Sequence, residues 1–179
     1  MNTRSLLLLL GTALPGAAVA QQMPMAPKDG SVSSTRPVYE MAKGWLTRAA
    51  EQVPEEHYSF KPTPEVRTFG QLIGHVADAQ YMMCSAIKGE TNPAKGSFEK
   101  TTDKAALVQA LKDSFGYCDG AYQISEMKAM EEISLFEGMK GSRLWALVFN
   151  AAHDWEHYGN VVTYMRLKGM VPPSSQQGM

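Results

Sequence analysis

Apolar residues recur every three to four positions along four long segments of the sequence, and this spacing is that of an amphipathic helix. The segments cover residues 36–53, 68–88, 102–131 and 142–168. Thr68 is suited to cap the start of the second segment, while Gly89 and Gly169 follow the ends of the second and fourth. No stretch shows strand alternation of useful length. The pattern predicts an all-α protein, and specifically a four-helix bundle.

The third predicted helix is the weakest of the four. It contains Gly116 and Gly120, each of which costs about 1 kcal/mol in a helix interior. We nevertheless expect it to continue to Glu131, before Gly138 and Gly141 break the chain.

The two ends of the chain lie outside the predicted bundle. Residues 1–20 combine a positive start, a run of leucines and a small-residue cleavage site, so we expect a signal peptide removed after Ala20. Pro15 and Gly16 interrupt the apolar run, which is shorter than the roughly 20 residues that span a membrane. We therefore expect a periplasmic or secreted protein with no stable membrane insertion after cleavage. The remaining boundaries are a flexible leader over 21–35, the bundle over 36–173 and a tail over 174–179.

The charge of the chain gives no indication of a nucleic-acid partner. There are 17 Lys and Arg residues against 18 Asp and Glu residues, which gives a formal net charge of −1. Proteins that bind a phosphate backbone carry a basic face or stripe. We expect no nucleic acid among the partners, and a small-molecule substrate or ligand instead.

The last predicted helix contains His153 and His157 at a spacing of four residues. This spacing places both imidazoles on one helical face, where they can reach one metal ion. The same string also satisfies the inverted zinc-protease motif H-x-x-E-H. Such a site needs further ligands or catalytic groups downstream, but residues 158–179 contain no Asp, Glu, His or Cys. A peptidase of that type is therefore excluded, and any third protein ligand must lie upstream.

Two histidines are available upstream, His57 in a predicted turn and His75 in the helix over 68–88. We expect His57 to be exposed. His75 lies beside the apolar stripe of its helix, so a neighbouring helix could share a site with it. A lone helical histidine is usually structural, but three histidines from two helices form a site with an open coordination position, as catalytic metals require.

The helix over 142–168 is expected to be buried on two sides. Its main apolar stripe consists of Leu144, Leu147, Val148, Ala151, Trp155, Tyr158, Val162 and Met165. His153 and His157 fall on the other side at about 100° per residue. One side would pack against the bundle and the other would line a pocket; the alternative is that the two histidines face water.

Several stretches of this sequence together resemble the DinB/YfiT-like superfamily over residues 38–173. They are Val53-Pro54-Glu55-Glu56, Arg67-Thr68-Phe69-Gly70, Leu72-Ile73-Gly74-His75, His153-Asp154-Trp155-Glu156-His157-Tyr158-Gly159-Asn160 and Tyr164-Met165-Arg166-Leu167-Lys168-Gly169. The resemblance implies a bundle of up-down-down-up connectivity that is often a homodimer. It also implies a divalent metal, zinc or nickel, held by His75, His153 and His157.

The implied connectivity makes the helices over 68–88 and 102–131 parallel. Cys84 and Cys118 then lie at similar depths in neighbouring helices, within reach of a disulfide. An exported protein would meet an oxidising environment that allows this bond. The resemblance thus predicts a bond between Cys84 and Cys118.

The sequence is compatible with three hypotheses about function. The first is an exported metal-dependent enzyme, either a hydrolase or a thiol S-transferase, with Glu156 or Asp78 as acid–base helpers. Export argues against the thiol reading, because the reduced thiol pools that such enzymes use are cytosolic. The second is a stress-response module that binds a metal or small ligand without catalysis. The third is a structural bundle with vestigial histidines.

Overall fold

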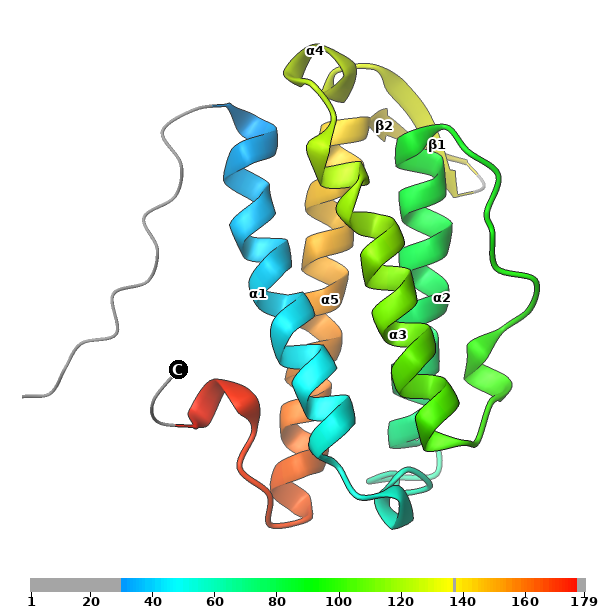
Figure 1. Cartoon of the computed structure of the whole chain (residues 1–179), viewed down its shortest axis with the longest axis vertical. Coiled ribbons are helices and arrows are strands. Elements are labelled where there is room, and N and C mark those ends of the chain that lie inside the picture. Colours follow the sequence, from blue (N-terminus) through cyan, green and yellow to red (C-terminus); the bar gives the residue numbers. More distant parts are fainter. Residues whose placement is uncertain (1–29, 137, 177–179) are drawn as a thin grey trace, which may run out of the picture.

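The computed structural model describes residues 30–136 and 138–176. The predicted signal peptide, most of the predicted leader and the last three residues of the tail lie outside the described residues. Within these residues four helices exceed fifteen residues, namely α1 (Ser31–Gln52), α2 (Phe69–Lys88), α3 (Lys104–Asp119) and α5 (Arg143–Leu167). They lie side by side, with α1 and α5 running in one direction and α2 and α3 in the other (Figure 1). No helix of this part of the chain is both long and apolar enough to cross a membrane.

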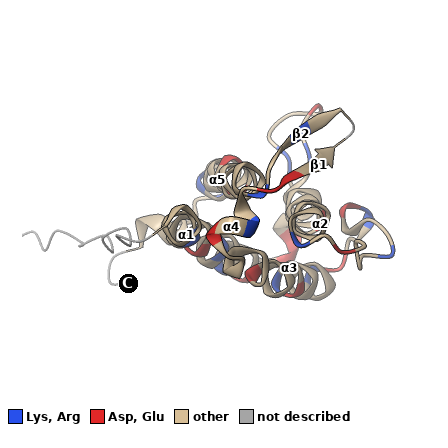
Figure 2. Cartoon of the chain, turned by 90° about the horizontal axis from the view of Figure 1, so that it is seen from above, with Lys and Arg blue, Asp and Glu red and all other residues tan. Residues whose placement is uncertain are grey.

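Seen end-on, the four long helices surround a common core (Figure 2). The helix α2 packs against both α3 and α5, and α1 packs mainly against α5. The protein is therefore mostly helical, as the sequence predicts. The short helix α4 (Glu126–Ala129) lies across one end of the core (Figure 2).

Sequence signals set the limits of α2. The Thr68 side chain accepts a hydrogen bond from the Gln71 backbone N–H, and the Gln71 side chain accepts one from the Thr68 N–H. These reciprocal bonds form a capping box. Gly89 ends the helix in the left-handed conformation, with a φ of 77°, which glycine adopts without steric cost.

The first helix begins five residues earlier than predicted, at Ser31. Its first N–H groups are capped by a distant side chain, because the Glu126 carboxylate accepts hydrogen bonds from Ser31 N (3.0 Å) and Val32 N (2.9 Å). A cap that lies 95 residues away in the sequence stabilises this end of the helix, so local sequence signals could not reveal it.

The predicted continuation of the third helix to Glu131 is wrong. The helix ends at Asp119, followed by a 3-10 turn over Ala121–Gln123 and then α4. Beyond this end the Tyr122 side chain is buried in the core, where its single hydroxyl proton is shared between Leu147 O (2.9 Å) and Asn150 Oδ1 (2.8 Å).

The expectation of a chain without strands is also wrong. An antiparallel hairpin joins β1 (Glu132–Phe136) to β2 (Met139–Ser142), with Ile133 opposite Gly141. The alternation of Ile133 and Leu135 with polar neighbours was a signal for β1 that its shortness concealed. The chain then enters α5 through Ser142, whose side chain caps that helix.

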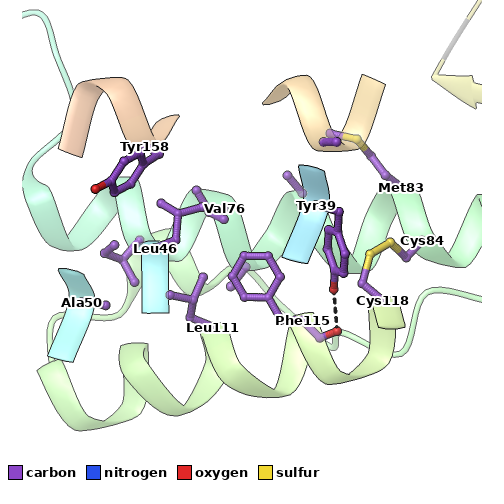
Figure 3. Packing of buried hydrophobic residues seen from close by; sticks show 14 of the residues in the cluster. Tyr39, Leu46, Ala50, Val76, Met83, Cys84, Leu111, Phe115, Cys118 and Tyr158 are labelled. Atoms are coloured by element: carbon purple, nitrogen blue, oxygen red, sulfur yellow. Dashed lines mark hydrogen bonds between the residues drawn. A yellow bond between two sulfur atoms is a disulfide. The ribbon is translucent and has the colours of Figure 1, made fainter. Parts of the chain in front are cut away.

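The core contains a dense layer of aromatic and sulfur-containing side chains (Figure 3). The ring of Tyr39 stacks on that of Tyr122, with centroids 4.0 Å apart, and the Tyr39 hydroxyl donates to Phe115 O (2.9 Å). Cys84 of α2 and Cys118 of α3 form a disulfide with Cα atoms 5.2 Å apart, which confirms the predicted pair. Both cysteines are fully buried.

The predicted apolar stripe of α5 is buried or packed against the core except at Val148, and the buried face is wider than predicted. Val148, which was assigned to the core, is 48% exposed. Asn150 and Asp154 are instead fully buried, and they pair with the buried Gln80 of α2. His157 is nearly buried as well, so it belongs to the same broad buried face and not to a separate side.

Candidate metal centre

Three histidines from two helices meet between α2 and α5. His75 lies early in α2, and His153 and His157 lie one turn apart in α5. The Nε2 atom of His153 is 3.3 Å from that of His75 and 2.9 Å from that of His157. One ligand atom from each ring lies within 4.8 Å of the others. The structure thus brings together the three histidines that the sequence singles out. His57 is not in this cluster; it lies in the 3-10 turn Glu55–His57 and is partly buried rather than exposed.

The donor set fits a divalent cation. Three ring nitrogens that face one another cannot all be satisfied by shared protons, because a neutral imidazole has one donor and one acceptor. A tetrahedral zinc ion with Zn–N bonds of about 2.0–2.1 Å would separate its ligand nitrogens by about 3.3 Å. The Nε2 separation is also 3.3 Å between His75 and His153, and it is shorter, 2.9 Å, between His153 and His157. Imidazole ligands suit zinc, nickel and copper alike, so the donors identify no single metal.

Burial sets the protonation state of the three rings. It lowers the pKa of His153 to about 3, and repulsion from His157 and then His75 adds to the shift. It lowers the pKa of His157 to about 4, again with a contribution from His75. The pKa of His75 is lowered by burial and by the nearby Arg67 charge, against which Glu99 acts. The rings are therefore neutral near pH 7, which is the form that binds metal ions.

The outer nitrogens of the three rings differ in their surroundings. His75 Nδ1 lies 3.4 Å from Glu99 Oε2. The Nδ1 atoms of His153 and His157 are buried and have no hydrogen-bond partner within the described part of the chain. The other carboxylate oxygen of Glu99 contacts Arg67 Nε at 2.9 Å. Sequence reasoning missed Glu99, which lies 24 positions after His75 in a connection without a motif.

The two predicted acid–base helpers occupy different surroundings. Glu156 is exposed and, with His157, lines a surface pocket of about 630 Å³ that also involves Arg67 and Asn160. Asp78 instead binds the connection between α2 and α3, where it accepts hydrogen bonds from residues 97–99. A larger hollow of about 670 Å³ is lined by Ser97 and Glu99 of this connection and by no histidine of the described residues.

Comparison with known proteins places this arrangement in a family context. The chain is 27% identical to the uncharacterized protein YjoA of Bacillus subtilis (strain 168) over 135 residues, which are 73% of this chain and 86% of that protein. The crystal structure of that DinB-like protein matches with a TM-score of 0.62 at 24% identity, over 83% of this chain and 99% of its own.

Two further solved structures share the fold. A DinB-like protein from Bacillus cereus ATCC 10987 matches with a TM-score of 0.68 at 14% identity, over 78% of this chain and 94% of its own. The mycothiol-dependent maleylpyruvate isomerase matches with a TM-score of 0.56 at 18% identity, over 74% of this chain and 65% of the isomerase. The family model of the DinB superfamily matches residues 39–161, which is well over half of the chain. The protein therefore belongs to the DinB superfamily.

Proposed function

We propose that the protein is an exported, divalent-metal-dependent enzyme of the hydrolase or thiol S-transferase type. The observation that carries this proposal is the convergence of the Nε2 atoms of His75, His153 and His157. Export rests on the character of residues 1–20. The directions of the long helices in Figure 1 support an up-down-down-up bundle, and we propose a homodimer as its assembly.

The three histidines would hold zinc or nickel through Nε2 and leave at least one coordination position free. A cation held there supplies Lewis acidity, which polarises a carbonyl group or lowers the pKa of a water or thiol. The protein itself keeps the rings neutral by burial, so that they are ready to bind. Two of these rings are fixed on one rigid helix, which preserves their relative position.

The pocket beside His157 is the proposed substrate site. Its polar side chains include Arg67, Glu156, Asn160 and Thr163. Arg67 uses Nε toward Glu99, so the rest of its guanidinium is available to orient an acceptor group on the substrate. Glu156 is the group proposed to accept or donate a proton there. Asp78 is not proposed for this role, because both of its carboxylate oxygens already accept hydrogen bonds.

Two observations favour different reaction types. The mycothiol-dependent isomerase shares the fold and supports a thiol-dependent reaction. The predicted signal peptide over residues 1–20 supports a hydrolase, because an exported enzyme has little access to reduced cytosolic thiols. Both types use the same metal chemistry, so a test of the metal centre comes before a test of the substrate.

The decisive experiment is elemental analysis of residues 21–179, purified without a histidine tag, beside a variant with His75, His153 and His157 all changed to alanine. We expect about one zinc or nickel ion per chain in the wild type and none in the variant. Absence of metal from both, even after incubation with zinc and nickel salts, would refute the proposal. A metal-loaded protein without turnover of ester, amide or thiol-transfer substrates would favour the non-catalytic binding module.

A further inference from the structure

We infer that Glu99 is a positioning residue for the metal centre, acting through His75. Its carboxylate accepts the Nδ1 proton of His75 and so presents Nε2 to the metal as a fixed lone pair. This inference rests on the proposed metal centre, and it assigns a function to a residue in the connection between α2 and α3.

The two ring nitrogens of His75 face different partners. Nε2 faces His153 Nε2 at 3.3 Å, and Nδ1 faces Glu99 Oε2 at 3.4 Å. A metal ligand must have no proton on its ligating nitrogen, so the neutral ring carries its proton on the other one. A carboxylate beside that nitrogen stabilises this tautomer and makes the ring a stronger ligand.

The helix α2 itself anchors the segment that carries Glu99. Asp78 lies three residues after His75 on α2, and it receives three hydrogen bonds from this segment. The donors are Ser97 Oγ (2.6 Å), Phe98 N (2.9 Å) and Glu99 N (3.3 Å). The backbone of Glu99 is thus attached to the same helix as the histidine that its side chain contacts.

This segment also approaches α2 closely at Gly74. A Cβ atom at Gly74 would lie 2.5 Å from Phe98 O and 2.7 Å from Glu99 N. Only a residue without a side chain permits this approach, and Gly74 directly precedes His75. Gly74, directly before His75, and Asp78, three residues after it, therefore fix the position of the Glu99 backbone.

The two oxygens of the Glu99 carboxylate have different partners. Arg67 Nε contacts Glu99 Oε1 at 2.9 Å, which leaves Oε2 for His75. The side chains of Arg67 and Glu99 are 42% and 31% exposed, so their ion pair adds little to folding stability. Because this ion pair stabilises the fold little, we assign it a positional role: it orients the Glu99 carboxylate toward His75.

The experiment measures zinc affinity by competition with a chromophoric chelator. Glu99→Gln keeps the size of the side chain and removes its charge, and Glu99→Ala removes the acceptor as well. We expect zinc binding to weaken about 10- to 100-fold, more in the alanine variant. Glu90→Gln is the matched control: Glu90 lies in the same connection but pairs with Lys88 and Tyr117, so we expect unchanged affinity.

A second readout separates positioning from general structural damage. Side-chain ¹H–¹⁵N spectra of the zinc-free protein report which nitrogen of His75 carries the proton. We expect the Nδ1–H form in the wild type and a mixture of both forms in Glu99→Ala. The melting temperature should change by no more than about 2 °C, because Glu99 lies at the surface.

The outcomes distinguish this inference from the proposed function. If wild type binds zinc through His75 and both Glu99 variants bind it equally well, the positioning role is overturned and the metal centre stands. If wild type binds no metal, the proposed function fails, and the tautomer of His75 still decides whether Glu99 orients the ring. An unchanged tautomer in Glu99→Ala overturns the inference in either case.

Discussion

Gln80 Nε2 of α2 donates a hydrogen bond to Asp154 Oδ1 of α5, and neither side chain is exposed to solvent. Gln80 Oε1 in turn accepts from Asn150 Nδ2 (3.2 Å), and Asn150 Oδ1 accepts from the Tyr122 hydroxyl (2.8 Å). Burial raises the pKa of Asp154 well above its ordinary value, against the opposing effect of the Gln80 bond. The core of the bundle is therefore crossed by a directed polar network that contains a fully buried carboxyl group.

Replacement of Gln80 by leucine should destabilise the protein by about 2–4 kcal/mol. The variant would leave Asp154 Oδ1 buried without a partner and Asn150 Nδ2 with only the weak acceptor Met83 Sδ, which is more costly than the loss of the bonds alone. Urea unfolding monitored by circular dichroism measures the change. Gln109→Leu is the control, since Gln109 is exposed and bonds only to Asp113 one turn away; its effect should stay within about 0.5 kcal/mol. A loss below 1 kcal/mol for Gln80→Leu would show that the network is dispensable.

This network also explains why the buried face of α5 is wider than the sequence predicts. A periodicity argument assigns the core to apolar positions, and it therefore chose Val148 over Asn150 and Asp154. In the folded chain those polar residues hydrogen-bond to Gln80 on another helix, a contact that periodicity does not reveal. In contrast, the limits of α2 depend on Thr68 and Gly89, whose effects are local, and these limits were predicted correctly.

The same distinction between local and distant effects applies to the candidate site. The spacing of His153 and His157 is local, and it places both rings on one face of a helix before any tertiary structure is known. Glu99 approaches His75 only because the connection after α2 folds back along that helix. A single sequence carries no signal for such a return, so the histidine pair of the candidate site was predictable and the carboxylate beside His75 was not.

The disulfide should contribute about 3–4 kcal/mol to stability. Cys84 and Cys118 are separated by 34 residues, and closing a loop of that length reduces the entropy of the unfolded chain by a corresponding amount. Urea unfolding of the purified, oxidised protein, with and without reductant, measures the difference. Two free thiols in the denatured but unreduced protein would contradict the bond itself.

Alanine substitution at two helical glycines should have opposite effects. Gly44→Ala in α1 meets no atom within 4 Å, so the lower flexibility of alanine should stabilise the protein by up to about 1 kcal/mol. Gly74→Ala in α2 meets Phe98 O at 2.5 Å, and the forced displacement should cost about 1–3 kcal/mol. Because both changes gain the same helix propensity, the difference isolates the contact with the connection after α2. Thermal or urea unfolding of the pair measures it, and equal effects would show that this connection yields freely.

Stability should fall above about pH 10, and Tyr39 should account for part of the loss. Burial raises the pKa of Tyr39 well above its ordinary value, as does the neighbouring Asp119, and burial does the same for Tyr122. The folded protein therefore keeps these protons at a pH where the unfolded chain releases them. The folded state then binds more protons, so the free energy of unfolding decreases as pH rises, by about 1.4 kcal/mol per pH unit for each tyrosine.

Tyr39→Phe removes one of these protons and should make the alkaline decline shallower by about 1.4 kcal/mol per pH unit. At pH 7 the variant should be less stable than wild type by about 1–2 kcal/mol, because Phe115 O and Asp119 Oδ1 lose the one hydroxyl proton that they share. The two stability curves should converge as pH rises beyond 10. Urea unfolding at intervals between pH 8 and pH 11.5 measures both curves, and parallel curves would mean that Tyr39 ionises equally easily in the folded and unfolded states.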